Sequence, residues 1–168
     1  MKYKMIAVDM DGTLLTHEKI ITKRNLDALT AAQEKGVLTV VATGRDIAGV
    51  DIYPEIISLK SPVILCNGAK IVKFPEGNYL YKQDFDRNVA LRVISEGVKR
   101  NTTMCIWSSG NLYANVYNDN VRTYEKYSRG SAIIMPDMTP LLDIGITKIL
   151  WYDEPALIPR YMEEMKAL

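Results

Sequence analysis

The sequence predicts an α/β fold, with a parallel, doubly wound sheet in the first part of the chain and an α+β module after it. Short apolar segments alternate with helical patterns up to about residue 69, and each apolar segment ends in polar residues or glycine. Beyond that point the pattern changes to strand–turn–strand pairs and helical segments, which is typical of an antiparallel sheet covered by helices.

The first strand is predicted at residues 5–8, because "MIAV" is apolar throughout and followed by turn residues, a pattern typical of a strand buried on both faces. Helical spacing of apolar residues predicts a crossover helix over residues 22–35, with Thr22 as its N-cap and Gly36 as its stop. Two further apolar segments, separated by a short helical stretch, predict strands at residues 37–43 and 62–67. Short links between these elements imply parallel connections, and such sheets bind ligands beyond the carboxyl ends of their strands.

The α+β module begins with a predicted hairpin, in which the turn cluster "PEGN" separates strands at residues 69–74 and 79–85. Ser109 and Gly110 form the turn of a second predicted hairpin, with strands at residues 103–108 and 111–118. The other predicted elements are helices at residues 87–99, 121–128 and 155–168 and a strand at residues 146–153. Tyr and Trp alternate along these strands, which indicates a small aromatic core.

Composition and charge give no indication of a nucleic-acid-binding, membrane-spanning or secreted protein. Lys and Arg number 21 against 20 Asp and Glu in 168 residues, so the net charge of +1 gives no electrostatic indication of a nucleic acid or membrane partner. No apolar segment approaches the roughly 20 residues that span a bilayer, and the N-terminus lacks a signal peptide. We therefore expect a cytoplasmic protein.

The two cysteines are predicted to be reduced core residues, because Cys66 and Cys105 lie far apart in apolar segments. A cysteine-dependent phosphatase needs an arginine six positions after its cysteine. Val72 and Asn111 occupy those positions, so that chemistry is excluded.

Asp9 and Asp11 are the most informative residues, since two carboxylates this close repel each other and attract a cation. A calcium loop of the EF-hand type is excluded, because Leu14 replaces its glycine and Ile20 replaces its last glutamate. An exposed turn without function is the better interpretation of an isolated Asp-x-Asp-Gly. The context favours a functional site instead, because Asp9, Thr43 and Asn67 each end a predicted parallel strand, where such sheets bind ligands.

The two acids suit phosphoryl transfer. One carboxylate can attack phosphorus to form an acyl phosphate, while the other protonates the leaving alkoxide and then deprotonates water. A carboxylate and a phosphate dianion repel each other, so the reaction needs a hard cation, and Mg²⁺ fits.

"DMDGTLL", "VVATGR" and "ILCNGA", in this order and each at the end of a predicted strand, resemble the haloacid dehalogenase (HAD) superfamily and, within it, the Cof-type phosphatases. The resemblance implies a HAD-like Rossmannoid core at residues 1–69 and an inserted α+β cap domain at residues 70–168. It also implies that Asp9 is the nucleophile and Asp11 the general acid and base. Mg²⁺ would be bound by the Asp9 carboxylate and the Asp11 backbone carbonyl.

The same resemblance assigns phosphate binding to the hydroxyl of Thr43, while Gly12 and Gly44 let backbone N–H groups approach the phosphoryl group. Independently of it, Thr43 and Gly44 precede "RDIAGV", which predicts a helix N-terminus beside the anion. Arg45 either holds substrate or pairs with a surface acid, and Asn67 either contacts substrate or forms a hinge. The single histidine, His17, is predicted to face solvent.

Two family motifs are missing, namely a lysine that neutralises the phosphate and a "GDxxND"-like stretch that completes the metal site. The first strand also lacks a second parallel neighbour, so we expect a truncated chain with a partial core, an incomplete cap and an open sheet edge that favours homo-oligomers. Activity should be weak or absent.

The sequence thus predicts a Mg²⁺-dependent phosphatase of small phosphorylated metabolites, such as sugar phosphates, impaired in this form. A non-catalytic binding or assembly domain with the same fold remains an alternative, as does a phosphotransferase or sugar-phosphate mutase that uses the same aspartyl phosphate.

Overall fold

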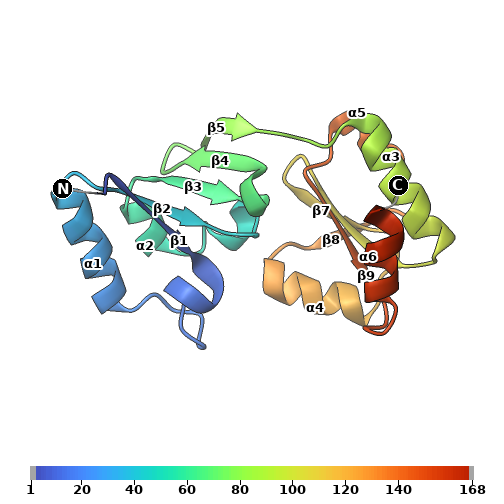
Figure 1. The fold of residues 1–168 in the computed structure, drawn as a ribbon, viewed down its shortest axis with the longest axis horizontal. Helices are drawn as coiled ribbons and strands as arrows, with labels where there is room; N and C mark the ends of the chain where they lie inside the picture. The colour runs from blue at the N-terminus through green and yellow to red at the C-terminus, as the bar shows by residue number, and fades with distance from the viewer. Residues whose placement is uncertain (1–2, 167–168) are drawn as a thin grey trace. The chain divides into compact units, whose positions relative to one another are not determined.

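The computed structural model describes residues 3–166, which form two compact units divided between Gln83 and Asp84 (Figure 1). Each unit contains one sheet. No helix in the described part of the chain is long and apolar enough to cross a membrane.

The first unit is built on a five-stranded sheet of order β1-β2-β3-β4-β5. Its first three strands run parallel and residues 70–82 form a hairpin, β4–β5, as the sequence predicts, but the hairpin joins this sheet antiparallel to β3 instead of belonging to the second unit. The strands are β1 (Met5–Asp9), β2 (Leu38–Ala42), β3 (Pro62–Leu65), β4 (Lys70–Lys73) and β5 (Asn78–Lys82), and the helices are α1 (Lys23–Glu34) and α2 (Pro54–Ser58). Because β4 and β5 pair onto β3, the compact unit extends to Gln83 instead of ending after residue 69.

The helix α1 confirms its predicted boundaries. The hydroxyl of Thr22 accepts a hydrogen bond from the Asn25 N–H at 3.2 Å, which satisfies one of the free donors of the first turn. Gly36, just past the C-terminus of the helix, has a φ of +77°, a conformation that favours glycine.

One hydrophobic cluster holds the first unit together. Leu29 of α1 and Ile56 of α2 pack against it, so both helices contribute to the same core. Its buried members include Met10, Leu14, Val41, Val63, Leu65 and Val72.

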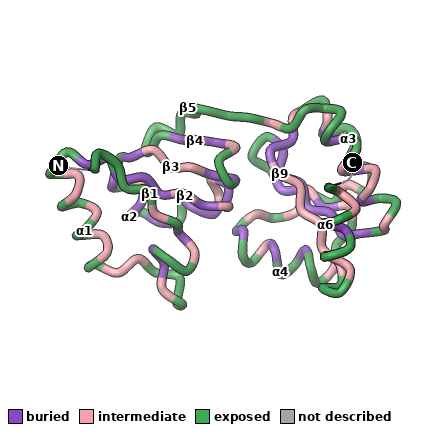
Figure 2. Tube along the Cα trace, viewed as in Figure 1, coloured by how far each residue is buried: buried purple, intermediate pink, exposed green. Residues whose placement is uncertain are grey.

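The prediction that residues 5–8 form a strand buried on both faces is wrong. Met5 is 56% and Ile6 is 38% exposed, and only Val8 is partly buried against the core (Figure 2). The reason is the position of β1, which pairs with β2 on one side and has no second strand among the described residues. The apolar residues 5–8 therefore predicted a strand correctly, but they did not show that this strand lies at the edge of the sheet.

The second unit has a four-stranded sheet of order β8-β7-β6-β9. The predicted hairpin is confirmed as β6–β7, and the predicted strand at 146–153 is confirmed as β9, which pairs antiparallel with β6. The strands are β6 (Thr103–Ser108), β7 (Asn111–Ala114), β8 (Ala132–Ile134) and β9 (Lys148–Tyr152). The helices are α3 (Arg87–Lys99), α4 (Asp119–Ser128), α5 (Leu141–Ile144) and α6 (Ile158–Lys166).

Two short elements of this unit, β8 and α5, were not predicted, because three or four residues carry too little periodicity. The last two residues of the predicted helix 155–168 lie outside the described residues.

Every residue of β6 is buried, so this strand forms the centre of the second core. Met104 and Ile106 pack against Ala90 and Ile94 of α3. The indole N–H of Trp107 donates a hydrogen bond to the Tyr124 hydroxyl at 2.8 Å. These contacts confirm the predicted aromatic core only in part, because Tyr117 and Tyr127 are each 50% exposed.

Both cysteines are free and buried, as the sequence predicts. Burial raises the pKa of the Cys105 thiol to about 11, so this group remains protonated at neutral pH.

Candidate active site at the carboxyl ends of the parallel strands

Three loops leave the carboxyl ends of β1, β2 and β3. We call them the first loop (residues 9–14), the second loop (residues 43–46) and the third loop (residues 66–69). They enclose an open hollow of about 330 Å³ within the first unit. The hollow is lined by Asp9, Ala42, Thr43, Gly44, Ile64, Asn67 and Gly68.

The first loop begins with Asp9, which lines this hollow. Met10 and Leu14 are buried in the core and anchor the loop at two points. Gly12 has a φ of +79°, which lets the chain turn back between these anchors. The Thr13 hydroxyl donates a hydrogen bond to Asp9 Oδ2 at 3.3 Å and so helps to orient the carboxylate.

Asp11 does not line the hollow, because its carboxylate is held by two cations. Arg45 Nε donates to Oδ2 and Arg45 Nη2 donates to Oδ1, both at 2.8 Å. Lys19 Nζ lies 3.0 Å from Oδ1. The hydrogen bonds from Arg45 lower the pKa of Asp11 below its ordinary value, against the opposing effect of burial, and Lys19 lowers the pKa further. Asp11 is therefore ionised at neutral pH in this geometry.

Of the two roles predicted for Arg45, pairing with a surface acid is not what the structure shows. Its side chain is only 5% exposed, and it pairs with Asp11 of the first loop, not with a surface acid. Arg45 Nη1 also donates to the Gly49 carbonyl at 3.0 Å, and its guanidinium lies 5.8 Å from the centre of the Tyr53 ring. Arg45 thus ties the first loop to the second.

The second loop brings Thr43 and Gly44 to the hollow, where the sequence predicted them. The Thr43 hydroxyl accepts a hydrogen bond from the Arg45 N–H at 3.2 Å. A Cβ on Gly44 would lie 2.7 Å from Asn67 Oδ1, so only glycine allows Asn67 its observed position.

The predicted helix N-terminus beside Thr43 and Gly44 is not confirmed. Only one turn of 3₁₀ helix, Ile47–Gly49, follows the second loop, and Asp46 caps it by accepting from the Ile47 N–H at 2.6 Å. A single turn has little dipole, and the Asp46 carboxylate already occupies its first donor.

The third loop places Asn67 against the second loop. Cys66, Asn67 and Gly68 have φ values of +51°, +56° and +102°, three successive left-handed residues, two of which are not glycine. The Cys66 N–H donates to the Arg45 carbonyl at 2.9 Å and the Asn67 N–H donates to the Thr43 carbonyl at 3.2 Å. Of the two roles predicted for Asn67, contact with a bound molecule agrees with its position in the hollow.

Sequence reasoning missed a buried ion pair at this site. Lys70 Nζ lies 2.6 Å from Asp46 Oδ2, and the two side chains are 1% and 2% exposed. A lysine at the start of a predicted strand and an aspartate directly after "TGR" were the only signals. His17, by contrast, is exposed as predicted.

The donor set is sparse but compatible with Mg²⁺. No cluster of three or more His, Cys, Asp or Glu side chains that could hold a metal occurs within residues 3–166. Mg²⁺ commonly uses only one or two protein carboxylates and completes its shell with water and phosphate oxygens. The Asp9 carboxylate and the Asp11 backbone carbonyl are the groups that could hold it.

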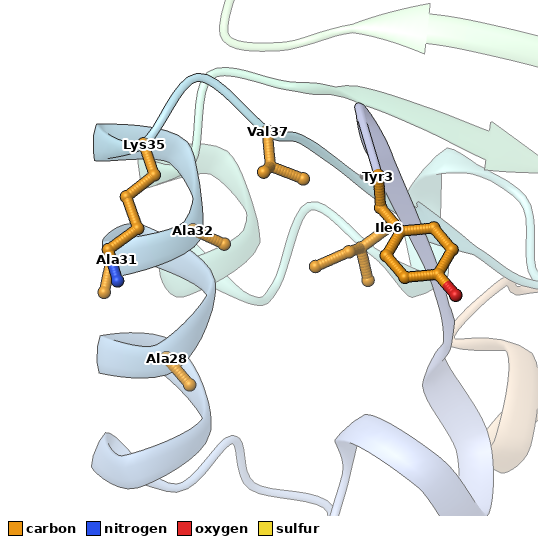
Figure 3. Close-up of a pocket in the computed structure, with 7 residues that line it drawn as sticks. All are labelled: Tyr3, Ile6, Ala28, Ala31, Ala32, Lys35 and Val37. Atoms are coloured by element: carbon orange, nitrogen blue, oxygen red, sulfur yellow. The ribbon is translucent and has the colours of Figure 1, made fainter. Parts of the chain in front are cut away.

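A larger groove in the first unit, of about 510 Å³, is not a catalytic candidate (Figure 3). Ala28 and Ala32 of α1 point towards Ile6 of β1 across it. Its lining is mostly apolar and contains no carboxylate, thiol or imidazole; it consists of Tyr3, Ile6, Ala28, Ala31, Ala32, Lys35 and Val37.

Comparison with known proteins identifies the family of the chain. A family model described as haloacid dehalogenase-like hydrolase matches residues 6–168. The chain belongs to this family. The predicted HAD superfamily and Cof-type subclass are both confirmed.

Relatives of this HAD chain include YxeH of Bacillus subtilis (strain 168), 31% identical over 163 residues that cover 94% of the chain and 60% of YxeH. The pyridoxal phosphate phosphatase YbhA of Escherichia coli (strain K12) is 34% identical over 74 residues, 44% of the chain and 27% of YbhA. A solved haloacid dehalogenase-like hydrolase from B. subtilis superposes with a TM-score of 0.80 at 24% identity, over 95% of the chain and 66% of that structure. The chain spans about 60% of the length of YxeH.

Proposed function

We propose that this HAD-family chain hydrolyses small phosphorylated metabolites through an aspartyl phosphate on Asp9. The observation that carries the proposal is that Asp9 lines one hollow together with Thr43, Gly44 and Asn67. A phosphoryl group in a hollow of this size meets a nucleophile on one side and hydrogen-bond donors on the other.

The first step forms a bond between an Asp9 carboxylate oxygen and phosphorus, while the bond from phosphorus to the ester oxygen breaks. The Thr43 hydroxyl and the Gly44 N–H donate hydrogen bonds to the phosphoryl oxygens, where negative charge must be stabilised. A bound Mg²⁺ would supply the positive charge that lets a carboxylate approach a phosphate. Water then attacks the acyl phosphate, which releases inorganic phosphate and restores the Asp9 carboxylate.

Asp11 would serve both steps in different protonation states. As a base it must be ionised to accept a proton from the attacking water, and Arg45 and Lys19 hold it in that state here. As an acid it must carry a proton for the leaving alkoxide, which requires the carboxyl to leave the Arg45 guanidinium. The observed ionisation of Asp11 therefore suits the second step, but its carboxyl must rotate away from Arg45 and towards the hollow before either step.

A non-catalytic phosphate-binding domain is the second candidate, and two observations favour it. Asp11 is held away from the hollow, and the described residues contain no third acid for a metal. The substitution Asp9→Asn separates the two candidates. A hydrolase loses its Mg²⁺-dependent rate with an aryl phosphate, whereas a binding domain shows the same residual rate in both proteins.

We propose small monoesters as substrates because the name of YbhA describes a pyridoxal phosphate phosphatase and the hollow beside Asp9 has a volume of only about 330 Å³. Product analysis tests the remaining alternative. A hydrolase releases inorganic phosphate, while a phosphotransferase or sugar-phosphate mutase transfers the group to a second hydroxyl.

A further inference from the structure

The buried ion pair between Lys70 and Asp46 has no part in the chemistry described above. Lys70 is the first residue of β4 and follows the third loop, while Asp46 ends the second loop. The pair therefore joins the two loops that carry Thr43 and Asn67, from a position where both side chains are almost wholly buried. Removing two charged groups from water costs free energy, and their mutual attraction offsets that cost only when the geometry of the pair is good.

The third loop needs such a restraint. Cys66 and Asn67 both hold left-handed backbone conformations that residues with side chains adopt rarely, and such strain persists only where the surroundings fix it. Two backbone hydrogen bonds restrain the loop on the side of the hollow, from the Cys66 and Asn67 N–H groups to the second loop. The ion pair adds a third connection to the second loop, from the residue that directly follows the third loop.

Asp46 also links the pair to the start of the helical turn. Its Oδ1 accepts the Ile47 N–H at 2.6 Å while Oδ2 accepts from Lys70 at 2.6 Å, so one carboxylate fixes both the second loop and the third. Burial lowers the pKa of Lys70, but the hydrogen bond and charge of Asp46 outweigh that effect and leave the pKa raised. Lys70 is therefore an ammonium ion at neutral pH.

We propose that Lys70 is a positioning residue, which acts through Asp46 to hold Asn67 and Thr43 against a bound phosphoryl group. The proposal rests on the proposed function for its ligand, but the restraint on the loops can be measured without one. Lys73 provides a matched control, since it lies on the same strand with about half of its side chain exposed.

The test compares the wild type with Lys70→Met and Lys73→Met by amide hydrogen exchange. We expect Lys70→Met to reduce the protection of the Cys66 and Asn67 amides at least tenfold relative to the Val40 amide of β2. Lys73→Met should leave this ratio within twofold. A Lys70→Met protein in which the loop and β2 amides lose protection equally, or in which neither does, would overturn the proposal.

Because Lys70→Met leaves Asp46 buried without its partner, that variant can fail to fold. The double variant Asp46→Asn/Lys70→Met removes both charges, and we expect it to fold with the same loss of loop protection. Recovery of wild-type protection in the double variant would show that the charges only neutralise each other, and it would overturn the positioning role.

Titration with inorganic phosphate in MgCl₂, followed at the Gly44 amide by NMR, connects the restraint to binding. We expect the dissociation constant to rise at least fivefold in the double variant and to stay within twofold in Lys73→Met. Equal constants in the wild type and the double variant would overturn the proposal. Absence of any response in the wild type would instead refute the proposed function, while the exchange ratio still decides the role of Lys70.

Discussion

The substitution Arg45→Met should destabilise the first unit in a pH-dependent way. It removes two hydrogen bonds of 2.8 Å to the Asp11 carboxylate and one of 3.0 Å to the Gly49 carbonyl. Removing one partner of a buried ion pair destabilises a protein by about 3–5 kcal/mol. We expect the low end of this range here, because the Asp11 side chain is 20% exposed and still pairs with Lys19 in the variant. We expect a loss of about 3 kcal/mol at pH 6.

The sign of the pH dependence follows from Asp11. Its pKa in the folded chain lies below the ordinary value of 3.8, so the pairing contributes stability at pH values above about 4. That contribution disappears as the pH falls through the lowered pKa. The difference in unfolding free energy between wild type and Arg45→Met should therefore shrink between pH 6 and pH 3.

The assay must report on the first unit alone. Both tryptophans, Trp107 and Trp151, lie in the second unit, so their fluorescence would follow the wrong transition. Hydrogen exchange of the buried Val40 and Val41 amides in β2 reports the first unit directly. Lys23→Met, which removes an exposed ion pair with Asp27, serves as the control and should change little. A stability difference in Arg45→Met that stays constant from pH 6 to pH 3 would refute the role assigned to Asp11.

Three further predictions follow from local geometry. Gly44→Ala should displace Asn67 and weaken binding of inorganic phosphate at least tenfold by NMR titration, and unchanged binding would show that Asn67 moves freely. The edge of β1 that has no neighbouring strand among the described residues should pair with a second copy of the chain. Sedimentation in the ultracentrifuge should therefore give dimers, which Ile6→Lys dissociates. A monomeric wild type would contradict the pairing. Cys105, buried with a pKa raised to about 11, should resist iodoacetamide at pH 7.5 until the chain is unfolded, and rapid labelling of the native chain would contradict its burial.

Most of the fold could be predicted because its signals are local. The cap at Thr22, the glycine at position 36 and the turn cluster "PEGN" each specify one boundary through the chemistry of a few residues. The exposure of β1 could not be predicted, since the same apolar residues suit a central strand and an edge strand. Which strand lies beside it depends on contacts between distant parts of the chain.

Part of the candidate site could likewise be predicted from the sequence, and part could not. The meeting of Asp9, Thr43 and Asn67 could be predicted, because each follows a predicted parallel strand and such strands bring their carboxyl ends to the same edge of the sheet. The partners of Arg45 and Lys70 could not be predicted, since each pairs with an acid more than twenty positions away in the sequence. Charge alone does not reveal which acid a buried cation will meet.

The role of Asp9 as nucleophile is tested by hydrolysis of an aryl phosphate, measured for the wild-type chain and for Asp9→Asn with and without MgCl₂. We expect a slow rate that requires both Mg²⁺ and the Asp9 carboxylate, so Asp9→Asn should fall to the rate of the uncatalysed reaction. Equal rates for the two proteins in MgCl₂ would contradict Asp9 as the nucleophile.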